Sequence, residues 1–86
     1  MDSLENRVAV ITGAASGIGF ALSVACAAAK MRVVMVDLPG AKLEQAAEGL
    51  RAIGHTPTPR GVDVSDTTAM HAMAKAIRAK FGKVGS

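Results

Sequence analysis

The chain has 86 residues, of which half are hydrophobic and two are aromatic, and its formal net charge is +3. This length indicates one small domain with an aliphatic core, and the hydrophobic content excludes an intrinsically disordered chain. The excess positive charge lies in residues 67–86, where four Lys and Arg occur with no acid and no set of stacking aromatics, so we expect a solvated helix face and no nucleic-acid partner.

The first predicted strand covers residues 8–11, an apolar run typical of a strand buried on both faces. A glycine-rich turn with the sequence TGAASGIG follows at residues 12–19, and an alanine-rich helix at residues 20–30. The glycines, serines and threonine of this uncharged region argue against a membrane span. The apolar residues at helical spacing, and so the expected core face of this helix, are Ile18, Leu22, Ala25, Cys26 and Ala29.

The glycine-rich turn is where the sequence most clearly predicts a ligand. Gly13 is expected to permit the tight turn, Gly17 to let the backbone approach the ligand, and Gly19 to let the helix pack closely on the strand. The first amide groups of the helix are expected to be unpaired, and with the helix dipole they favour an anion, most often a phosphate. The turn therefore predicts a nucleotide diphosphate site.

A second buried strand is predicted over residues 31–36, and it ends at Asp37 before the break at Pro39-Gly40. The next helix is amphipathic, and Gly54 suits its C-terminal cap. Its apolar positions are Leu43, Ala46, Ala47, Leu50 and Ile53.

A weaker third strand is predicted over residues 56–62, where two prolines favour the edge of a sheet. Ser65 or Asp66 can cap a third helix, and Gly82 is expected to end it. The apolar stripe of that helix is Met70, Met73, Ala74, Ile77 and Phe81. The resulting alternation, β-α-β-α-β-α with short connections, predicts a Rossmann-like α/β fold with a three-stranded parallel sheet and right-handed crossovers.

Acidic residues follow two of the predicted strands. Asp37, 18 residues after Gly19, can accept hydrogen bonds from a ribose hydroxyl pair and would repel a 2′-phosphate, which favours NAD over NADP. Leu38 follows it in place of a basic residue, and we assign Leu38 to the same cofactor site. Asp63 is either a turn or capping carboxylate or an acceptor for an adenine amino group, with Val64 against the ring.

These residues together, TGxxxGIG at 12–19 with Asp37 and Asp63-Val64, resemble the short-chain dehydrogenase/reductase family over nearly the whole chain. The resemblance implies a sheet whose strand order begins 3-2-1 and a bound NAD. It implies that Asp37 holds the adenosine ribose and that Asp63 and Val64 contact adenine. The residues it places around the pyrophosphate and ribose are Gly13, Ser16, Gly17, Ile18 and Gly19.

The family's catalytic Asn, Ser, Tyr and Lys would lie beyond Ser86, and the chain contains no tyrosine, so we assign no catalytic residue. Residues 1–86 are thus expected to be a partial dinucleotide-binding domain. Two hypotheses remain open. The chain is the cofactor-binding part of an NAD-dependent enzyme that interconverts alcohols and ketones, or it is a non-catalytic nucleotide-binding or interaction module produced by truncation.

Three further expectations concern partners and location. The edge of the first strand would be unpaired, which favours self-association of the isolated chain. Cys26 is the only cysteine and is expected to be a buried thiol in a reducing compartment, which indicates the cytoplasm. His55 and His71 are isolated in the sequence, so no metal site is expected.

Overall fold

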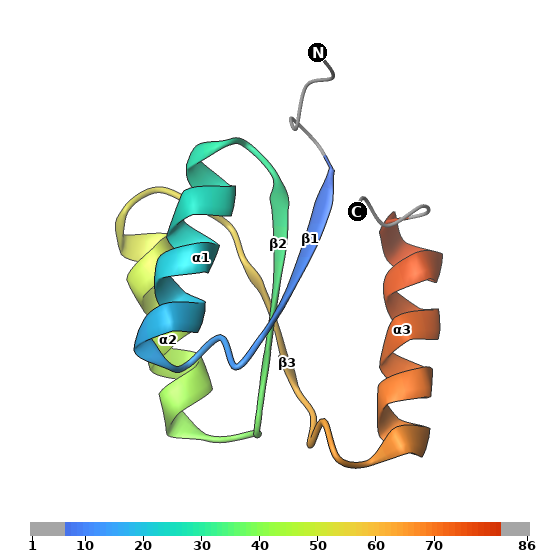
Figure 1. Ribbon diagram of the computed structural model, residues 1–86. Helices are drawn as coiled ribbons and strands as arrows, with labels where there is room; N and C mark the ends of the chain where they lie inside the picture. Colours follow the sequence, from blue (N-terminus) through green and yellow to red (C-terminus); the bar gives the residue numbers. More distant parts are fainter. Residues whose placement is uncertain (1–6, 82–86) are drawn as a thin grey trace.

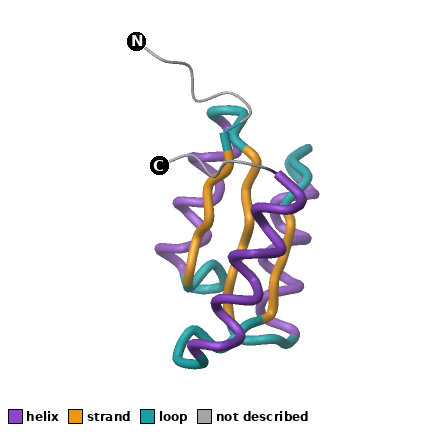
Figure 2. Tube along the Cα trace, turned by 90° about the vertical axis from the view of Figure 1, so that its right-hand side faces the viewer, coloured by secondary structure: helices purple, strands orange, loops and turns teal. Residues whose placement is uncertain are grey.

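The computed structural model describes residues 7–81. Strands and helices alternate along it as predicted. They are β1 (Val8–Thr12), α1 (Gly17–Ala28), β2 (Arg32–Asp37), α2 (Ala41–Ala52), β3 (Thr58–Gly61) and α3 (Thr67–Phe81). The sheet is parallel in the order β1-β2-β3, which is the predicted 3-2-1 order seen from its other edge. Helices α1 and α2 lie on one face and α3 on the other (Figures 1 and 2).

The two faces of the sheet carry separate apolar clusters, because successive side chains of a strand point to opposite faces. Val33 and Met35 of β2 pack under α1 and α2, together with Leu43, Ala47 and Leu50 of α2. Val34 and Val36 pack under α3 with Val8, Met73 and Ile77. The central strand β2 is therefore buried on both faces, as its continuous apolar sequence predicts.

The predicted core face of α1 is wrong. Ile18 and Leu22 are 79% and 52% exposed, and Ala25 and Ala29 are exposed as well. The buried residues of α1 are instead Gly19, Ser23 and Ala27, small side chains that let the helix lie close to the strands. Cys26 is half-buried against the same cluster rather than fully buried. The prediction failed because it placed the most hydrophobic residues in the core, whereas close packing of α1 on the strands leaves room only for small side chains there.

The other elements differ from expectation at single positions. Ile53 is 56% exposed because it is the C-terminal cap of α2, after which Gly54 takes a φ of +92°. Asp66 rather than Ser65 caps α3, since its Oδ1 accepts a hydrogen bond from the Ala69 amide at 3.0 Å. Ala74 is exposed, and the predicted stop at Gly82 lies outside the described residues. Strand β3 is shorter than the strand predicted over residues 56–62 and contains only the second of the two prolines, Pro59. It lies at an edge of the sheet, as predicted.

Candidate functional site

The carboxyl ends of all three strands and the amino ends of all three helices lie at one end of the molecule, the lower end in Figure 1. In open parallel sheets this end carries the ligand crevice. The partial positive charges of the helix amino ends make it favourable for an anion. The residues predicted to bind a cofactor all lie at this end: Asp37 is the last residue of β2, and the others follow β1, β2 or β3.

The turn between β1 and α1 is held by its own hydrogen bonds. Gly13 adopts a φ of +65°, a conformation that glycine takes without strain. The Ser16 hydroxyl donates to the Gly13 carbonyl at 2.7 Å and accepts from the Gly19 amide at 3.1 Å, so Ser16 is the N-cap of α1. A Cβ added to Gly19 would lie 2.0 Å from the Gly13 carbonyl oxygen. Gly19 therefore permits the close approach of helix and turn.

Two amide groups at the start of α1 are left for a ligand. Among residues 7–81, no acceptor is bonded to the N–H groups of Gly17 and Ile18, whereas Ser16 satisfies that of Gly19. A Cβ added to Gly17 would meet nothing within 4 Å. The structure thus offers two unpaired donors and open space beside them, which suits an anionic group.

Asp37, at the end of β2, lies against this turn. Its Oδ2 accepts a hydrogen bond from the Ala15 amide at 2.8 Å, and its Oδ1 accepts one from the Leu38 amide at 2.8 Å. Each carboxylate oxygen can accept more than one hydrogen bond, so both retain capacity for a ligand hydroxyl. Asp37 therefore joins β2 to the glycine turn, a role that the sequence did not reveal.

Asp63, after β3, forms a local turn. Its Oδ1 accepts hydrogen bonds from the Ser65 hydroxyl at 2.7 Å and from the Ser65 amide at 2.9 Å. These two bonds hold the pKa of the exposed Asp63 carboxyl below its ordinary value, and the bond from the Ser65 hydroxyl has the larger effect. Asp63 thus stabilises a turn, which is one of the roles predicted for it from the sequence. Val64 beside it is 56% exposed and Leu38 is 60% exposed, so two apolar side chains face solvent at neighbouring strand ends.

Two clefts meet at the glycine turn. One, which we call the β2–α2 cleft, has a volume of about 380 Å³ and is lined by Ser16, Asp37 and the chain from Leu38 to Lys42. The other, of about 350 Å³, lies between α1 and α2 and is lined by Gly17, Phe20 and Gln45 among others. Ala15, Ser16 and Lys42 border both clefts. Ala15 and Lys42 carry no motif signal, and only the three-dimensional arrangement brings them to the site.

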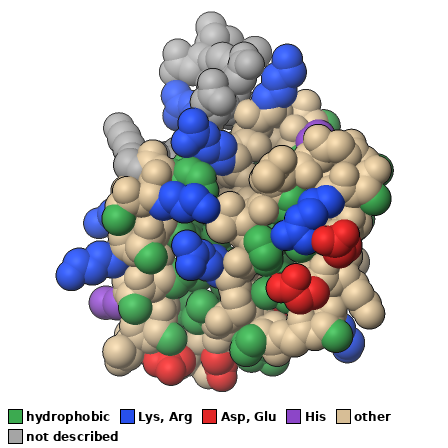
Figure 3. Space-filling model, turned by 180° about the vertical axis from the view of Figure 1, so that it is seen from behind, with side chains coloured by type: hydrophobic (Ala, Val, Ile, Leu, Met, Phe, Trp, Pro, Cys, Tyr) green, Lys and Arg blue, Asp and Glu red, His purple; other side chains and the backbone are tan. Residues whose placement is uncertain are grey.

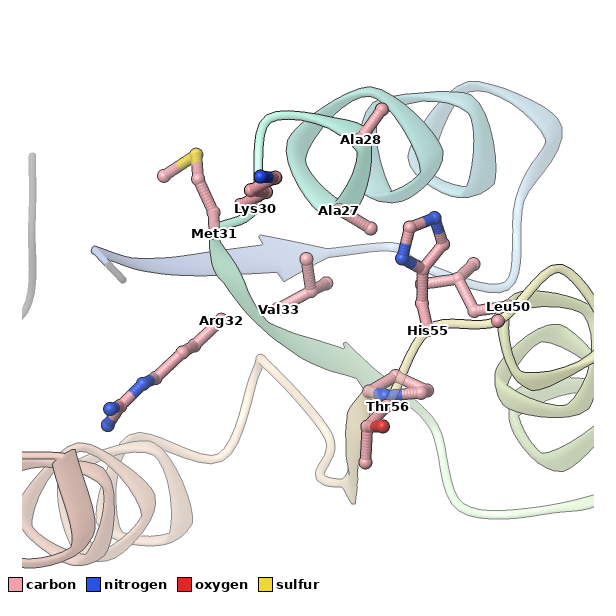
Figure 4. Close-up of a pocket in the computed structure, with 11 residues that line it drawn as sticks. Ala27, Ala28, Lys30, Met31, Arg32, Val33, Leu50, His55 and Thr56 are labelled. Carbon is pink, nitrogen blue, oxygen red and sulfur yellow. The ribbon is translucent and has the colours of Figure 1, made fainter. Parts of the chain in front are cut away.

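A third cleft, of about 370 Å³, lies at the opposite end of the sheet, where α1 and α2 end. In Figure 4 the His55 ring lies near Ala27 and Leu50, whereas Arg32 points away from them. Arg32 instead lies over the Phe81 ring, 5.8 Å from its centroid. In the described part of the chain, no three His, Cys, Asp or Glu residues come together as metal ligands would.

Charge is distributed unevenly over the surface. In Figure 3 Lys and Arg side chains gather on the side of the molecule that α3 forms, and acids lie at the lower edge and toward α2. Lys75, Arg78 and Lys80 lie on α3 and are exposed, as the prediction of a solvated helix face requires. Within residues 7–81, no helix is long and apolar enough to cross a membrane.

Comparison with known proteins identifies the family. The sequence profile of the short chain dehydrogenases matches residues 7–86. A 1-deoxy-11-beta-hydroxypentalenate dehydrogenase from Streptomyces avermitilis is 45% identical over 82 residues, which are 95% of this chain and 29% of that protein.

Solved structures agree with this match. A short chain dehydrogenase/reductase from Burkholderia phymatum in complex with NAD has a TM-score of 0.87 and 37% identity, over 98% of this chain and 30% of that one. A metagenomic short-chain oxidoreductase in complex with NADP has a TM-score of 0.87 and 31% identity, over 96% of this chain and 38% of that one. The chain thus spans about a third of the length of these relatives. Its fold, its glycine turn and the profile match show that it belongs to the short chain dehydrogenase family.

Proposed function

We propose that residues 1–86 form a partial dinucleotide-binding domain, the cofactor-binding segment of an NAD-dependent dehydrogenase. The observation that carries the proposal is the meeting of the free Gly17 and Ile18 amides with the Asp37 carboxylate at one end of the sheet. Amide donors at a helix amino end suit a pyrophosphate, and a carboxylate at the next strand end suits a ribose hydroxyl pair.

The residues around the turn would each contact a different part of the cofactor. Gly17 and Ile18 would donate to the pyrophosphate, while Gly13, Ser16 and Gly19 maintain the turn that aims those donors. Asp37 would accept from the adenosine ribose. Leu38 and Val64 are exposed apolar side chains at the ends of adjacent strands, and they would lie against adenine, with Asp63 accepting from its amino group.

A preference for NAD over NADP follows from the charge of Asp37. Its carboxylate would lie beside the ribose 2′ position, where a phosphate would be repelled and a hydroxyl can donate a hydrogen bond. Leu38 offers no compensating charge, and Ser16 is neutral. The solved relatives include complexes with NAD and with NADP, so the preference depends on these residues of this chain.

The nicotinamide ring of such a cofactor supplies the hydride in alcohol and ketone interconversion. These residues would bind and orient the adenosine half. A proton donor or acceptor within hydrogen-bond reach of the substrate oxygen is also needed, and the tyrosine that performs this step in the family is absent from the sequence. We therefore assign the reaction to a longer protein of this family. We also propose that the protein is cytoplasmic, because the single Cys26 suits a reducing compartment.

Calorimetric titration with NAD and with NADP tests this proposal. The wild-type chain should bind NAD more tightly, and Asp37→Asn should lower the ratio of NAD to NADP affinity at least about tenfold, because about 1.4 kcal/mol of repulsion or hydrogen bonding corresponds to that factor. Glu48→Gln on α2 makes the same charge change at a residue that lines neither cleft and should leave the ratio unchanged. Tighter binding of NADP by the wild-type chain would contradict the role of Asp37.

A further inference from the structure

The cleft at the opposite end of the sheet from the glycine turn, which we call the His55 cleft, has no part in the proposed function. It has a volume of about 370 Å³ and lies between the α1–β2 and α2–β3 connections (Figure 4). Val33, Leu50 and Pro57 line it and are buried, so the protein side of the cleft is largely apolar. A volume and a lining of this kind are typical of a site for a small molecule.

Three side chains that can donate hydrogen bonds line the same cleft. Lys30 comes from the α1–β2 connection, and His55 and Thr56 come from the α2–β3 connection. Among the described residues, the Lys30 ammonium, the His55 ring and the Thr56 hydroxyl have no hydrogen bond or ion pair with another protein group. Within residues 7–81, no Asp or Glu lines the cleft. The polar groups left free there therefore suit an anion.

The helix carboxyl ends at this cleft also favour an anion over a cation as ligand. The Ala27 carbonyl of α1 accepts a hydrogen bond from the Lys30 amide at 2.9 Å. The Leu50 carbonyl of α2 accepts one from the His55 amide at 3.0 Å. A cationic ligand would meet carbonyls that are already bonded and would be repelled by the Lys30 ammonium. The negative ends of the two helix dipoles oppose a doubly charged anion, so a single negative charge fits best.

The backbone of Lys30 adds an independent observation. Its φ is +65°, directly after Ala29, the C-cap of α1, and it is the one non-glycine residue with a positive φ in the described chain. Glycine adopts this conformation without strain and is the usual residue after a helix C-cap. Lysine costs stability at this position, and a strained residue of this kind often marks a functional site. The free ammonium group beside the cleft supplies a reason for a lysine there.

We propose that the His55 cleft binds a small monocarboxylate with an aliphatic chain. The Lys30 ammonium and the donors of His55 and Thr56 hold the carboxylate, and the apolar lining covers the chain. This site is separate from the cofactor site, and it does not depend on the proposed function.

Titration of the ¹⁵N-labelled chain with hexanoate, 1-hexanol and inorganic phosphate tests the inference. Hexanoate should move the Gly54 and His55 amide resonances saturably, with a dissociation constant on the order of millimolar for a ligand of this size. 1-Hexanol lacks the charge and should bind at least about twofold more weakly, and phosphate, which lacks the chain, should not saturate. NAD should not displace hexanoate, and displacement would show that the two sites are not separate.

Lys30→Gly separates the role of the side chain from that of the backbone. Loss of the ammonium group should weaken hexanoate binding about twofold to fivefold and leave 1-hexanol binding unchanged. Relief of the positive φ should keep the melting temperature or raise it by up to about 8 °C, so weaker binding would not reflect unfolding. Lys30→Arg retains the charge and should retain wild-type affinity. Lys75→Ala on α3 removes the same charge at a residue that does not line the His55 cleft and serves as the matched control.

Three results would each overturn the inference. They are the absence of saturable shifts with hexanoate in the folded wild-type chain, equal affinity for hexanoate and 1-hexanol, and wild-type affinity for hexanoate in the Lys30→Gly variant.

Discussion

Alanine at Gly17 and alanine at Gly19 should have opposite effects, although both glycines belong to the same turn. At Gly19 the added Cβ would lie 2.0 Å from the Gly13 carbonyl oxygen and 2.9 Å from the Ala14 Cα. The first distance is about 1 Å shorter than the 3.0 Å below which real Cβ atoms are essentially never found. The obstacle is backbone, and the Gly13 carbonyl is also fixed by hydrogen bonds from the Ser16 amide and hydroxyl.

The cost at Gly19 can be estimated from this overlap. Overpacking of a well-packed site costs about 1–3 kcal/mol, and a backbone obstacle places Gly19→Ala at the upper end, about 3 kcal/mol. For a domain of this size each kcal/mol lowers the melting temperature by about 4–8 °C, so a decrease of about 12–24 °C is expected. The chain would lose a large part of a total stability of about 4–13 kcal/mol.

Gly17→Ala should spare the fold and impair the ligand site. Its Cβ would meet no protein atom within 4 Å, and alanine is favoured over glycine in a helix by up to about 1 kcal/mol. The melting temperature should therefore stay unchanged or rise by a few degrees. The methyl group would occupy the space beside the free Gly17 amide, and NAD affinity should fall at least about tenfold.

Thermal unfolding followed by circular dichroism, with calorimetric titration of NAD, measures both effects. A Gly19→Ala variant as stable as the wild-type chain would refute the packing argument. A Gly17→Ala variant that binds NAD with wild-type affinity would refute the assignment of its amide to the ligand.

Three other predictions concern parts of the fold around the site. Asp66→Ala should destabilise the chain by about 1 kcal/mol in thermal or urea unfolding, because the α3 amino end loses its cap; an unchanged midpoint would show that the Ala69 amide needs no such partner. Ser65→Ala should raise the Asp63 pKa toward its ordinary value in a carboxyl NMR titration, and an unmoved titration curve would assign the lowered pKa to another cause. Because the folded-state pKa is the lower one, this contribution to stability is present above the unfolded-state pKa and is lost as the pH falls through the folded-state value, so Ser65→Ala should weaken the stability loss in acid. The edge of β1, which pairs only with β2 within residues 7–81, should cause the isolated chain to self-associate in light scattering, whereas a stable monomer would contradict this.

The order and type of the elements were predictable from the sequence because each has a strong local signal. Apolar runs without polar alternation specify buried parallel strands, and β2 is buried on both faces as predicted. The position of the glycine turn and Asp37 at the same end of the sheet was predictable, because strand ends and helix starts converge there in a parallel sheet. The two prolines correctly placed β3 at an edge.

The details that the sequence could not supply arise from tertiary packing. The core face of α1 consists of Gly19, Ser23 and Ala27, since the helix lies too close to the sheet for Ile18 or Leu22 to fit between them. The bond from the Ala15 amide to Asp37 joins residues 22 positions apart, and no spacing rule predicts it. Lys42 reaches the β2–α2 cleft only because α2 starts beside the glycine turn.

We propose above all that the amino end of α1 and the carboxyl end of β2 together hold the adenosine half of NAD. The most direct test is a titration of the ¹⁵N-labelled chain with NAD, followed through its backbone amide resonances. We expect the largest shifts at Gly17, Ile18 and Leu38, and we expect them to saturate together with one dissociation constant. Amides at the opposite end of the sheet, such as that of His55, should stay unchanged. Saturable shifts centred on His55, or no shifts in the folded chain at millimolar NAD, would contradict it.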